Sequence, residues 1–284
     1  MSAVGVPSSA SQPSVRAAVA GRWEHDPLLR RVVRQLPLLR VWTRREFRVR
    51  YRQSALGVTW SIVQPLATLA IFGVILRTVL HVSSEGYPYI SFAYAGLVPW
   101  TFALNGIGTS VTSVMNAGQV AGKVYFPREV IPIATVGVSA IDLCISSVLF
   151  FVILAIQGVG FTYHLLAMIP IFLVLLVIVT GIGVLLGVLT VFLRDLRYAV
   201  PLILQLVFIA TPIMYSPQLL HGKLATVEKF NPFAAVVDAV RQVALAKQWP
   251  DWSQLGLWGL IGVVFFALVL AYTRSVEPRI VDVM

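Results

Sequence analysis

Residues 44–65 read RREFRVRYRQSALGVTWSIVQP, a dense run of arginines that continues directly into the first long apolar segment. In a helix beginning near Pro37, arginines spaced four residues apart form one row along the surface: Arg40, Arg44, Arg48 and Arg52. Three apolar side chains fall roughly opposite this row: Leu38, Trp42 and Val49. The pattern predicts a basic amphipathic helix lying in a membrane surface, with its cations toward lipid headgroups. An ordinary solvated charged face that only sets membrane topology is the alternative.

The composition indicates a helical membrane protein that crosses the bilayer several times. Hydrophobic residues make up 58% of the chain and charged residues only 12%, against about 25% charged residues in a typical soluble protein. The net charge of +10 is concentrated near the N-terminus, where residues 22–52 contain ten arginines and three acidic residues. Because these cations adjoin an apolar span instead of covering a soluble surface, we expect no nucleic-acid partner.

Six apolar segments have roughly the 20 residues that cross a bilayer. We expect an all-α fold with spans at Val58–Leu80, Ile90–Met115, Ile131–Ile156, Leu165–Leu193, Ala199–Tyr215 and Leu255–Tyr272. The second segment contains Pro99 and Asn105, and a broken or partly re-entrant helix is an alternative there. Gln64-Pro65 is expected to kink the first span.

The expected organisation has four parts in chain order. A disordered cytosolic tail covers 1–21, a cytosolic interface-helix region covers 22–57, the six-span domain covers 58–273, and a cytosolic C-terminal tail covers 274–284. Within the six-span domain, residues 216–254 form an external loop. There Asn231-Pro232-Phe233 opens a helical run to about Trp249, because Asn caps helices and Pro suits their first turn. We read this run as a short external or re-entrant helix.

The distribution of basic residues predicts the orientation in a bacterial cytoplasmic membrane. With a cytosolic N-terminus, the predicted topology places 17 basic residues inside and five outside. Both termini are therefore expected in the cytosol.

The sequence contains no catalytic constellation, and its four histidines are scattered. The segment 118–124, GQVAGKV, has too few residues between its glycines for a phosphate-binding loop and lacks the Ser or Thr that would hold Mg²⁺. We therefore expect no cofactor in this chain and no enzymatic activity of its own. Cys144, the only cysteine, is expected to pack as a small hydrophobic residue.

Asp142 is the one acidic residue inside a clear span, and an intramembrane carboxylate is a functional candidate. Neighbouring serines offer hydrogen bonds to it: Ser139, Ser146 and Ser147. A role in helix packing is favoured over a proton relay, because a proton-coupled carrier usually has more than one such site.

Two further sets of residues are functional candidates. The short loop 120–132, VAGKVYFPREVIP, combines charge with aromatic rings, which is typical of a partner-docking segment, although a membrane anchor is the alternative. Large polar or aromatic side chains in the first two spans are candidates for lining a path for sugars, although ordinary packing also explains them: Trp60, Gln64, Phe92, Tyr94, Trp100 and Phe102.

Three sequence blocks in order resemble one family over about residues 38–274. They are RVRYRQSALGVTWSIVQP at 48–65, KVYFPREVIP at 123–132 and NPF at 231–233. Together they resemble the ABC-2 type permeases of polysaccharide ABC exporters, the group that includes O-antigen, teichoic-acid and galactan exporters. The first two blocks carry most of the resemblance, because NPF alone is a weak signal.

The resemblance implies a homodimer that docks on two copies of a separate ATP-binding subunit, which would bind ATP and Mg²⁺. It implies a substrate that is a polysaccharide on a polyprenyl-pyrophosphate lipid. It also implies contact with the ATPase or a cytosolic gate at one set of residues: Lys123, Tyr125, Phe126, Pro127, Arg128 and Glu129. Arginines at the headgroup level could pair with the pyrophosphate, since Arg suits bidentate phosphate contacts: Arg44, Arg45, Arg48, Arg50 and Arg52.

Two alternatives stay open at this point. An ABC-2 permease for a drug or a lipid would share the fold, although it would not require the basic block. An ion-coupled carrier acting alone would show acidic residues in paired spans and internal repeats, and the sequence shows neither.

Overall fold

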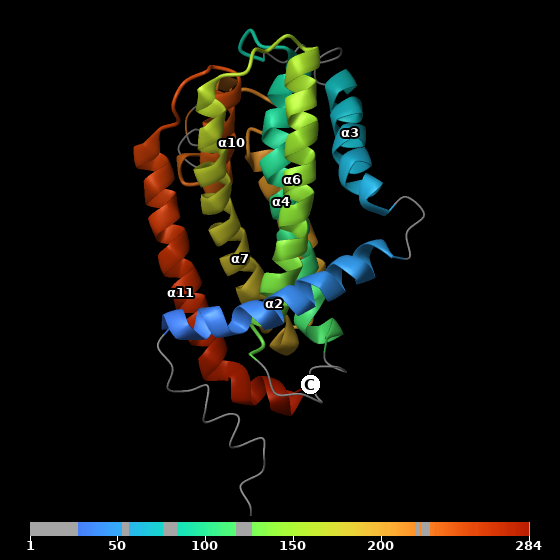
Figure 1. Ribbon diagram of the computed structural model, residues 1–284, viewed down its shortest axis with the longest axis vertical. Helices are drawn as coiled ribbons and strands as arrows, with labels where there is room; N and C mark the ends of the chain where they lie inside the picture. The colour runs from blue at the N-terminus through green and yellow to red at the C-terminus, as the bar shows by residue number, and fades with distance from the viewer. Residues whose placement is uncertain are drawn as a thin grey trace, which may run out of the picture.

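A computed structural model describes residues 28–52, 57–75, 84–117, 127–219, 222 and 228–283 (Figure 1). The predicted tail at 1–21 lies outside these residues. The described part contains these α-helices: α2 (Leu28–Tyr51), α3 (Trp60–Gly73), α4 (Tyr89–Asn116), α6 (Val130–Ile156), α7 (Met168–Phe192), α8 (Leu196–Ala210), α10 (Pro232–Ala244) and α11 (Trp252–Val283). Three short 3-10 helices accompany them: η1 (Gly57–Thr59), η3 (Tyr163–Ala167) and η4 (Pro217–Leu219). No β-strand occurs in this described part, so the all-α fold class is confirmed there.

Four helical stretches of the described chain are long and apolar enough to cross a bilayer: Tyr89–Asn116, Val130–Ile156, Tyr163–Phe192 and Trp252–Glu277. They coincide with the second, third, fourth and sixth predicted spans. Two shorter apolar helices, Trp60–Ile71 and Leu196–Ala210, fall at the predicted first and fifth spans. Since the first predicted span continues past the described residues, the count of six spans stays a prediction.

The fifth predicted span, Ala199–Tyr215, is wrong at its C-terminal end. Helix α8 stops at Ala210, and Thr211 has an extended backbone with φ −94° and ψ 130°. Pro212 follows directly, and proline disfavours a helical conformation in the residue before it. Helix α8 has 15 residues, so it is about 22 Å long and shorter than a bilayer core of about 30 Å.

The predicted helix after Asn231 is confirmed at its start and shorter at its end. The Asn231 side chain accepts a hydrogen bond from the backbone N–H of Phe233 at 3.0 Å, and Pro232 occupies the first helical position. The helix ends at Ala244 instead of near Trp249. The break considered for the second span does not occur, because α4 runs unbroken through its proline.

Helix α4 forms the centre of the bundle. It packs against α3, α6, α7, α8 and α10, and the N-terminal half of α4 is almost completely buried. Helices α6, α7 and α11 run alongside it in Figure 1, while the short α10 lies in the half of the bundle away from α2. A Cβ atom on Gly96 would lie only 2.5 Å from the carbonyl oxygen of Ile213. Glycine at this position therefore allows the segment after α8 to approach α4 closely.

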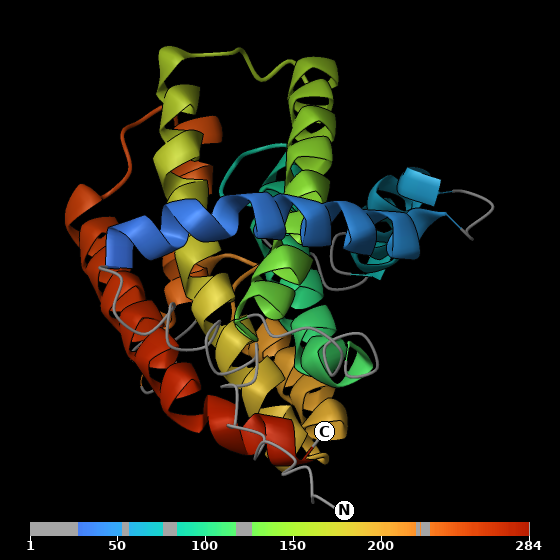
Figure 2. The ribbon, with the colours of Figure 1, turned by 60° about the horizontal axis from the view of Figure 1, so that its bottom comes forward.

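Helix α2 lies across the end of the bundle, whereas the spans run along it (Figures 1 and 2). It begins at Leu28, earlier than expected, and contains Pro37. Trp42 is buried against one cluster on the ends of α4 and α6: Ala117, Val130, Ile131 and Ala134. The predicted arginine row is exposed, and Val49 of the predicted apolar side is 64% exposed. Trp42 contacts the bundle, and Leu38 and Leu39 pack against the same cluster.

Candidate functional site

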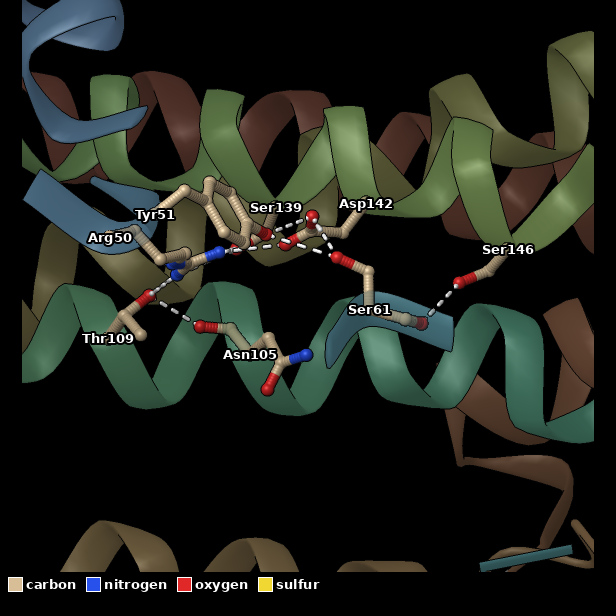
Figure 3. A network of polar contacts seen from close by, with 8 residues as sticks. All are labelled: Arg50, Tyr51, Ser61, Asn105, Thr109, Ser139, Asp142 and Ser146. Atoms are coloured by element: carbon tan, nitrogen blue, oxygen red, sulfur yellow. Dashed lines mark hydrogen bonds and ion pairs between the residues drawn. The ribbon is translucent and has the colours of Figure 1, made fainter. Parts of the chain in front are cut away.

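A charged junction joins the C-terminal end of α2 to the middle of α6 (Figure 3). Arg50 donates from Nη1 to Oδ2 of Asp142 at 2.8 Å, an ion pair between residues 92 positions apart. Ser61, in the first turn of α3, donates to Oδ1 of the same carboxylate at 2.8 Å, and the Tyr51 hydroxyl donates to that oxygen as well. The carboxylate of Asp142 thus holds α2, α3 and α6 together.

The guanidinium of Arg50 extends the junction to α4. Its Nη2 donates to the Thr109 hydroxyl at 3.2 Å, and both terminal nitrogens lie 3.4 Å from the Ser139 hydroxyl. Ser146 donates to the backbone oxygen of Ser61 at 3.5 Å. We define the Arg50–Asp142 junction by its members: Arg50, Tyr51, Ser61, Thr109, Ser139 and Asp142.

Burial explains why the junction needs so many partners. The Asp142 side chain is only 10% exposed and that of Arg50 24%, and an isolated charge placed there would lose its hydration without compensation. Burial, followed by the hydrogen bond to Asp142, raises the pKa of the Tyr51 phenol. Tyr51 therefore stays protonated and keeps donating to the carboxylate at neutral pH. The position of Arg50 in the last turn of α2 is also favourable for a cation.

Three cavities adjoin this end of α2. A cavity of about 230 Å³ is lined by the junction and its neighbours: Arg50, Tyr51, Gly57, Trp60, Ser61, Gln64, Asn105, Thr109 and Asp142. A second cavity, which we call the hydroxyl cleft, has a volume of about 370 Å³ and lies between α2, α4 and α6. Its lining residues are Arg45, Glu46, Val49, Arg50, Thr109, Thr112, Ser113, Asn116, Ala117, Thr135 and Val138. A third, the arginine pocket, has about 380 Å³ and is lined by Arg45, Arg48, Val49 and Arg52. Charged and polar groups therefore border open space at this end of the molecule.

The five predicted phosphate-contacting arginines have different surroundings. Arg44, Arg48 and Arg52 are exposed. Arg45 forms an ion pair with Glu46 at 2.9 Å, and its guanidinium lies 4.6 Å from the ring centroid of Trp42. Arg50 is already paired with Asp142.

The predicted coupling segment is described only in part. Lys123, Tyr125 and Phe126 lie outside the described residues, whereas Pro127, Arg128 and Glu129 are buried at the start of α6. Glu129 Oε1 lies 4.0 Å from Nε of Arg274 on α11. This contact ties the start of α6 to the far end of α11.

The six predicted path-lining residues fall into two groups. Trp60 and Gln64 are exposed and line the same cavity as Asp142. The other four are at most 3% exposed and pack within the chain: Phe92, Tyr94, Trp100 and Phe102. Trp100, for example, lies between Phe208 and Phe233, with ring centroids 5.6 and 5.8 Å away. Packing within one chain accounts for these four rings, so only Trp60 and Gln64 keep the exposure that a path wall needs.

A second buried arginine lies toward the other end of the bundle. Arg241 on α10 is 6% exposed and donates to the backbone oxygens of Pro212 at 2.8 Å and Ile213 at 2.6 Å. Its guanidinium lies 3.7 Å from the ring centroid of Phe92. Arg241 therefore satisfies two buried backbone carbonyl groups in the segment that follows α8.

An apolar groove of about 960 Å³ lies between α6 and α7. Cys144, which we expected to pack as a small hydrophobic residue, lines this groove and is exposed. Within the described residues, no other element covers it there.

Sequence reasoning singled out Asp142 and Arg50 separately but missed that they form a pair. Of the three predicted serine partners, none donates directly to the carboxylate; Ser147 instead donates to the backbone oxygen of Leu143. Tyr51, Ser61 and Thr109 were missed as well. The available signal was physical: one buried acid requires a cation, and the nearest dense set of cations precedes the first span.

Comparison with known proteins agrees with this architecture. The ABC-2 type transporter family matches residues 37–245. An O-antigen export system permease protein, RfbA, from Klebsiella pneumoniae is 27% identical over 87% of this chain and 95% of its own length. The protein of the same name from Myxococcus xanthus is 24% identical over 89% and 96%, and the polysialic acid transport protein KpsM from Escherichia coli is 23% identical over 82% and 91%. The chain thus belongs to the ABC-2 type transporter family.

Proposed function

We propose that this chain is the membrane-spanning subunit of an ATP-driven exporter that moves a polysaccharide, carried on a polyprenyl-pyrophosphate lipid, across the bacterial cytoplasmic membrane. The observation that carries the proposal is helix α2, whose exposed arginines lie across the end of the spans and whose last turn is fastened to Asp142. Such a helix offers cations to a phosphate at the headgroup level. Relatives named for O-antigen export and polysialic acid transport support the polysaccharide class.

In this proposal the energy comes from a separate subunit. Two copies of the chain form the membrane unit, and two copies of an ATP-binding subunit hold ATP and Mg²⁺. Both termini lie in the cytosol; the start of α2 and the end of α11 at one end of the molecule support this (Figure 1). Movement of the ATPase reaches the spans through the segment 120–132, and the contact of Glu129 with Arg274 would pass it to α11.

A lipid or drug substrate is the second candidate. The apolar groove between α6 and α7 favours it, because a groove with almost no polar lining suits an acyl chain or an apolar molecule. The arginine row favours the lipid-linked glycan, since an apolar drug gives these cations no partner.

Reconstitution tests both the subunit role and the substrate. We would purify the chain in lipid nanodiscs, alone and together with candidate ABC ATP-binding subunits, and measure ATP hydrolysis. We expect no hydrolysis by the chain alone and hydrolysis by a stable complex. The same complex in vesicles should then move a lipid-linked glycan, but not the sugar-free prenyl lipid, to the opposite leaflet. Transport driven by a proton gradient without any ATPase would contradict the proposal, and transport of the sugar-free lipid alone would favour the second candidate.

A further inference from the structure

Two cavities of different chemistry adjoin each other at helix α2. The arginine pocket is lined by three arginines and Val49, whereas five of the eleven residues that line the hydroxyl cleft are small polar residues of α4 and α6. Arg45 and Val49 line both cavities. A ligand held at this place can therefore contact both linings at once.

The arginine pocket has the chemistry of a phosphate site. Arg48 and Arg52 are exposed, and within the described residues neither forms an ion pair with a carboxylate. Nε of Arg48 contacts only the backbone oxygen of Arg44, at 3.4 Å. Both guanidinium groups thus keep donors for an anion, and their fork geometry suits two phosphate oxygens.

The hydroxyl cleft has the chemistry of a sugar site. Thr109, Thr112 and Asn116 recur at helical spacing on one face of α4, and Ser113 and Thr135 complete the lining. Several of these hydroxyls already donate to backbone oxygens, as Ser113 does to Ser110 and Thr135 to Ile131. Thr112 accepts a hydrogen bond from the Asn116 amide at 3.4 Å, and its hydroxyl oxygen keeps a second lone pair that can accept from a sugar hydroxyl group.

The charges beside the hydroxyl cleft are balanced. Arg45 is paired with Glu46 and Arg50 with Asp142, so neither guanidinium brings an unpaired charge to the cleft. This cleft therefore suits a neutral group rich in hydroxyls, and the anion belongs in the neighbouring pocket.

We propose that the arginine pocket and the hydroxyl cleft form one two-part site for a glycosyl phosphate, in which Arg48 and Arg52 bind the phosphate while Thr112 and Asn116 bind the first sugar. The inference rests on the proposed function, since it names the part of the lipid-linked glycan that this chain recognises. An anionic membrane lipid offers the same phosphate without the sugar. Only the hydroxyl cleft distinguishes the two sources.

Binding measurements on the full chain in zwitterionic phosphatidylcholine nanodiscs test this site. The probes are a short-chain prenyl pyrophosphate, the same lipid with one sugar attached, and an anionic phospholipid as competitor. The pocket variant is Arg48→Gln with Arg52→Gln. Its control is Arg194→Gln with Arg197→Gln, which removes the same charge from exposed positions outside α2 and outside all three cavities. The cleft variant is Thr112→Val with Asn116→Leu, and its control is Thr101→Val on the same helix.

The two variants should separate the two parts of the ligand. The pocket variant should weaken both prenyl probes by about tenfold or more, since each lost contact involves a charged group. The cleft variant should abolish only the extra affinity that the sugar provides, so that both probes then bind equally, and the anionic phospholipid should compete less well against the probe that carries the sugar. The two control variants should change neither probe more than about twofold.

Three results would overturn the two-part site. The first is equal weakening by the pocket variant and its control, which means a general surface charge. The second is an unchanged sugar preference in the cleft variant, or equal competition by the phospholipid against both probes, which means a headgroup site without sugar recognition. The third is the absence of binding by either prenyl probe. Wild-type export of the glycan with the ATPase separates these failures from a failure of the proposed function, which such export would leave standing.

Discussion

Arg241 and Arg50 both contact backbone or side-chain oxygens of other segments, and their surroundings differ. Arg241 is almost completely buried, donates to two backbone carbonyls and lines none of the four cavities described above. Arg50 is about a quarter exposed, pairs with a carboxylate from another helix and lines two of those cavities. The Arg241 guanidinium satisfies two buried backbone carbonyl groups, whereas the Arg50 guanidinium lies next to open space. Both residues are charged, so charge alone does not separate an arginine with a structural role, such as Arg241, from one at a candidate site, such as Arg50. Contact with a cavity does separate them.

The largest expected effect comes from replacing Arg241. Arg241→Met should destabilise the protein by about 4 kcal/mol, because the carbonyls of Pro212 and Ile213 lose their donors and cannot reach water. Thermal unfolding of the detergent-purified protein measures this loss, and Arg241→Lys should recover only part of it. An unchanged melting temperature in the Met variant would contradict the structural role of Arg241, and the contrast with Arg50 would then no longer hold.

The next largest effect is expected from breaking the Arg50–Asp142 ion pair. Arg50→Gln and Asp142→Asn should each cost about 2 kcal/mol, since each leaves a partly buried charge without its partner. The double variant should cost less than the sum, with a coupling energy of about 1–3 kcal/mol. A double-mutant cycle on thermal unfolding measures that coupling. Each single variant should also lower export per folded molecule, a loss that Arg241→Lys should not show. Additive costs with unchanged export would mean that the pair neither couples nor functions.

Gly96→Ala tests the close approach that accompanies Arg241. Its added Cβ would meet the Ile213 carbonyl, so the backbone must shift at a cost of about 2 kcal/mol. Gly108→Ala is the matched control on the same helix, because a Cβ there meets nothing within 4 Å. That control should be neutral or slightly stabilising, since Ala favours helix over Gly by about 1 kcal/mol. Equal melting temperatures for the two variants would contradict the packing described here.

The smallest effect should come from a charge at the surface. Asp251 accepts hydrogen bonds from Ser253 and from the backbone N–H of Gln254, and these bonds lower the pKa of its carboxyl. A lowered pKa adds stability above the ordinary pKa of Asp, and that stability is lost as the pH falls through the folded value. Asp251→Ala should therefore lower the melting temperature slightly at pH 7, and the difference from wild type should shrink as the pH falls and vanish below the lowered pKa of the folded protein. A difference that grows on acidification would contradict this sign.

The parts predicted from sequence are those that local periodicity determines. Long apolar runs placed α4, α6, α7 and most of α11, and the four-residue spacing placed the exposed arginines of α2. The Asn231 cap was also predictable, since capping depends on neighbours in sequence.

The remaining features depend on contacts between distant residues. The pairing of Arg50 with Asp142 joins positions that no local pattern relates. Composition could not separate buried rings from rings that line a path, so Phe92 and Tyr94 were grouped with Trp60 although they pack in the core. The early end of α8 had a local signal, Pro212, which the apolar character of the segment outweighed.

The placement of α2 has a mechanical consequence. The helix has 24 residues, so it is a rod about 36 Å long. Trp42 is the side chain of α2 that is buried in an apolar cluster, and it lies eight residues, or about 12 Å, from Arg50. A tilt of about 10° around that contact would move the end at Arg50 by about 2 Å, which is enough to break a hydrogen bond of 2.8 Å to Asp142. A rotation of α2 about its contact at Trp42 would therefore disturb the hydrogen bonds at which α2, α3, α4 and α6 meet.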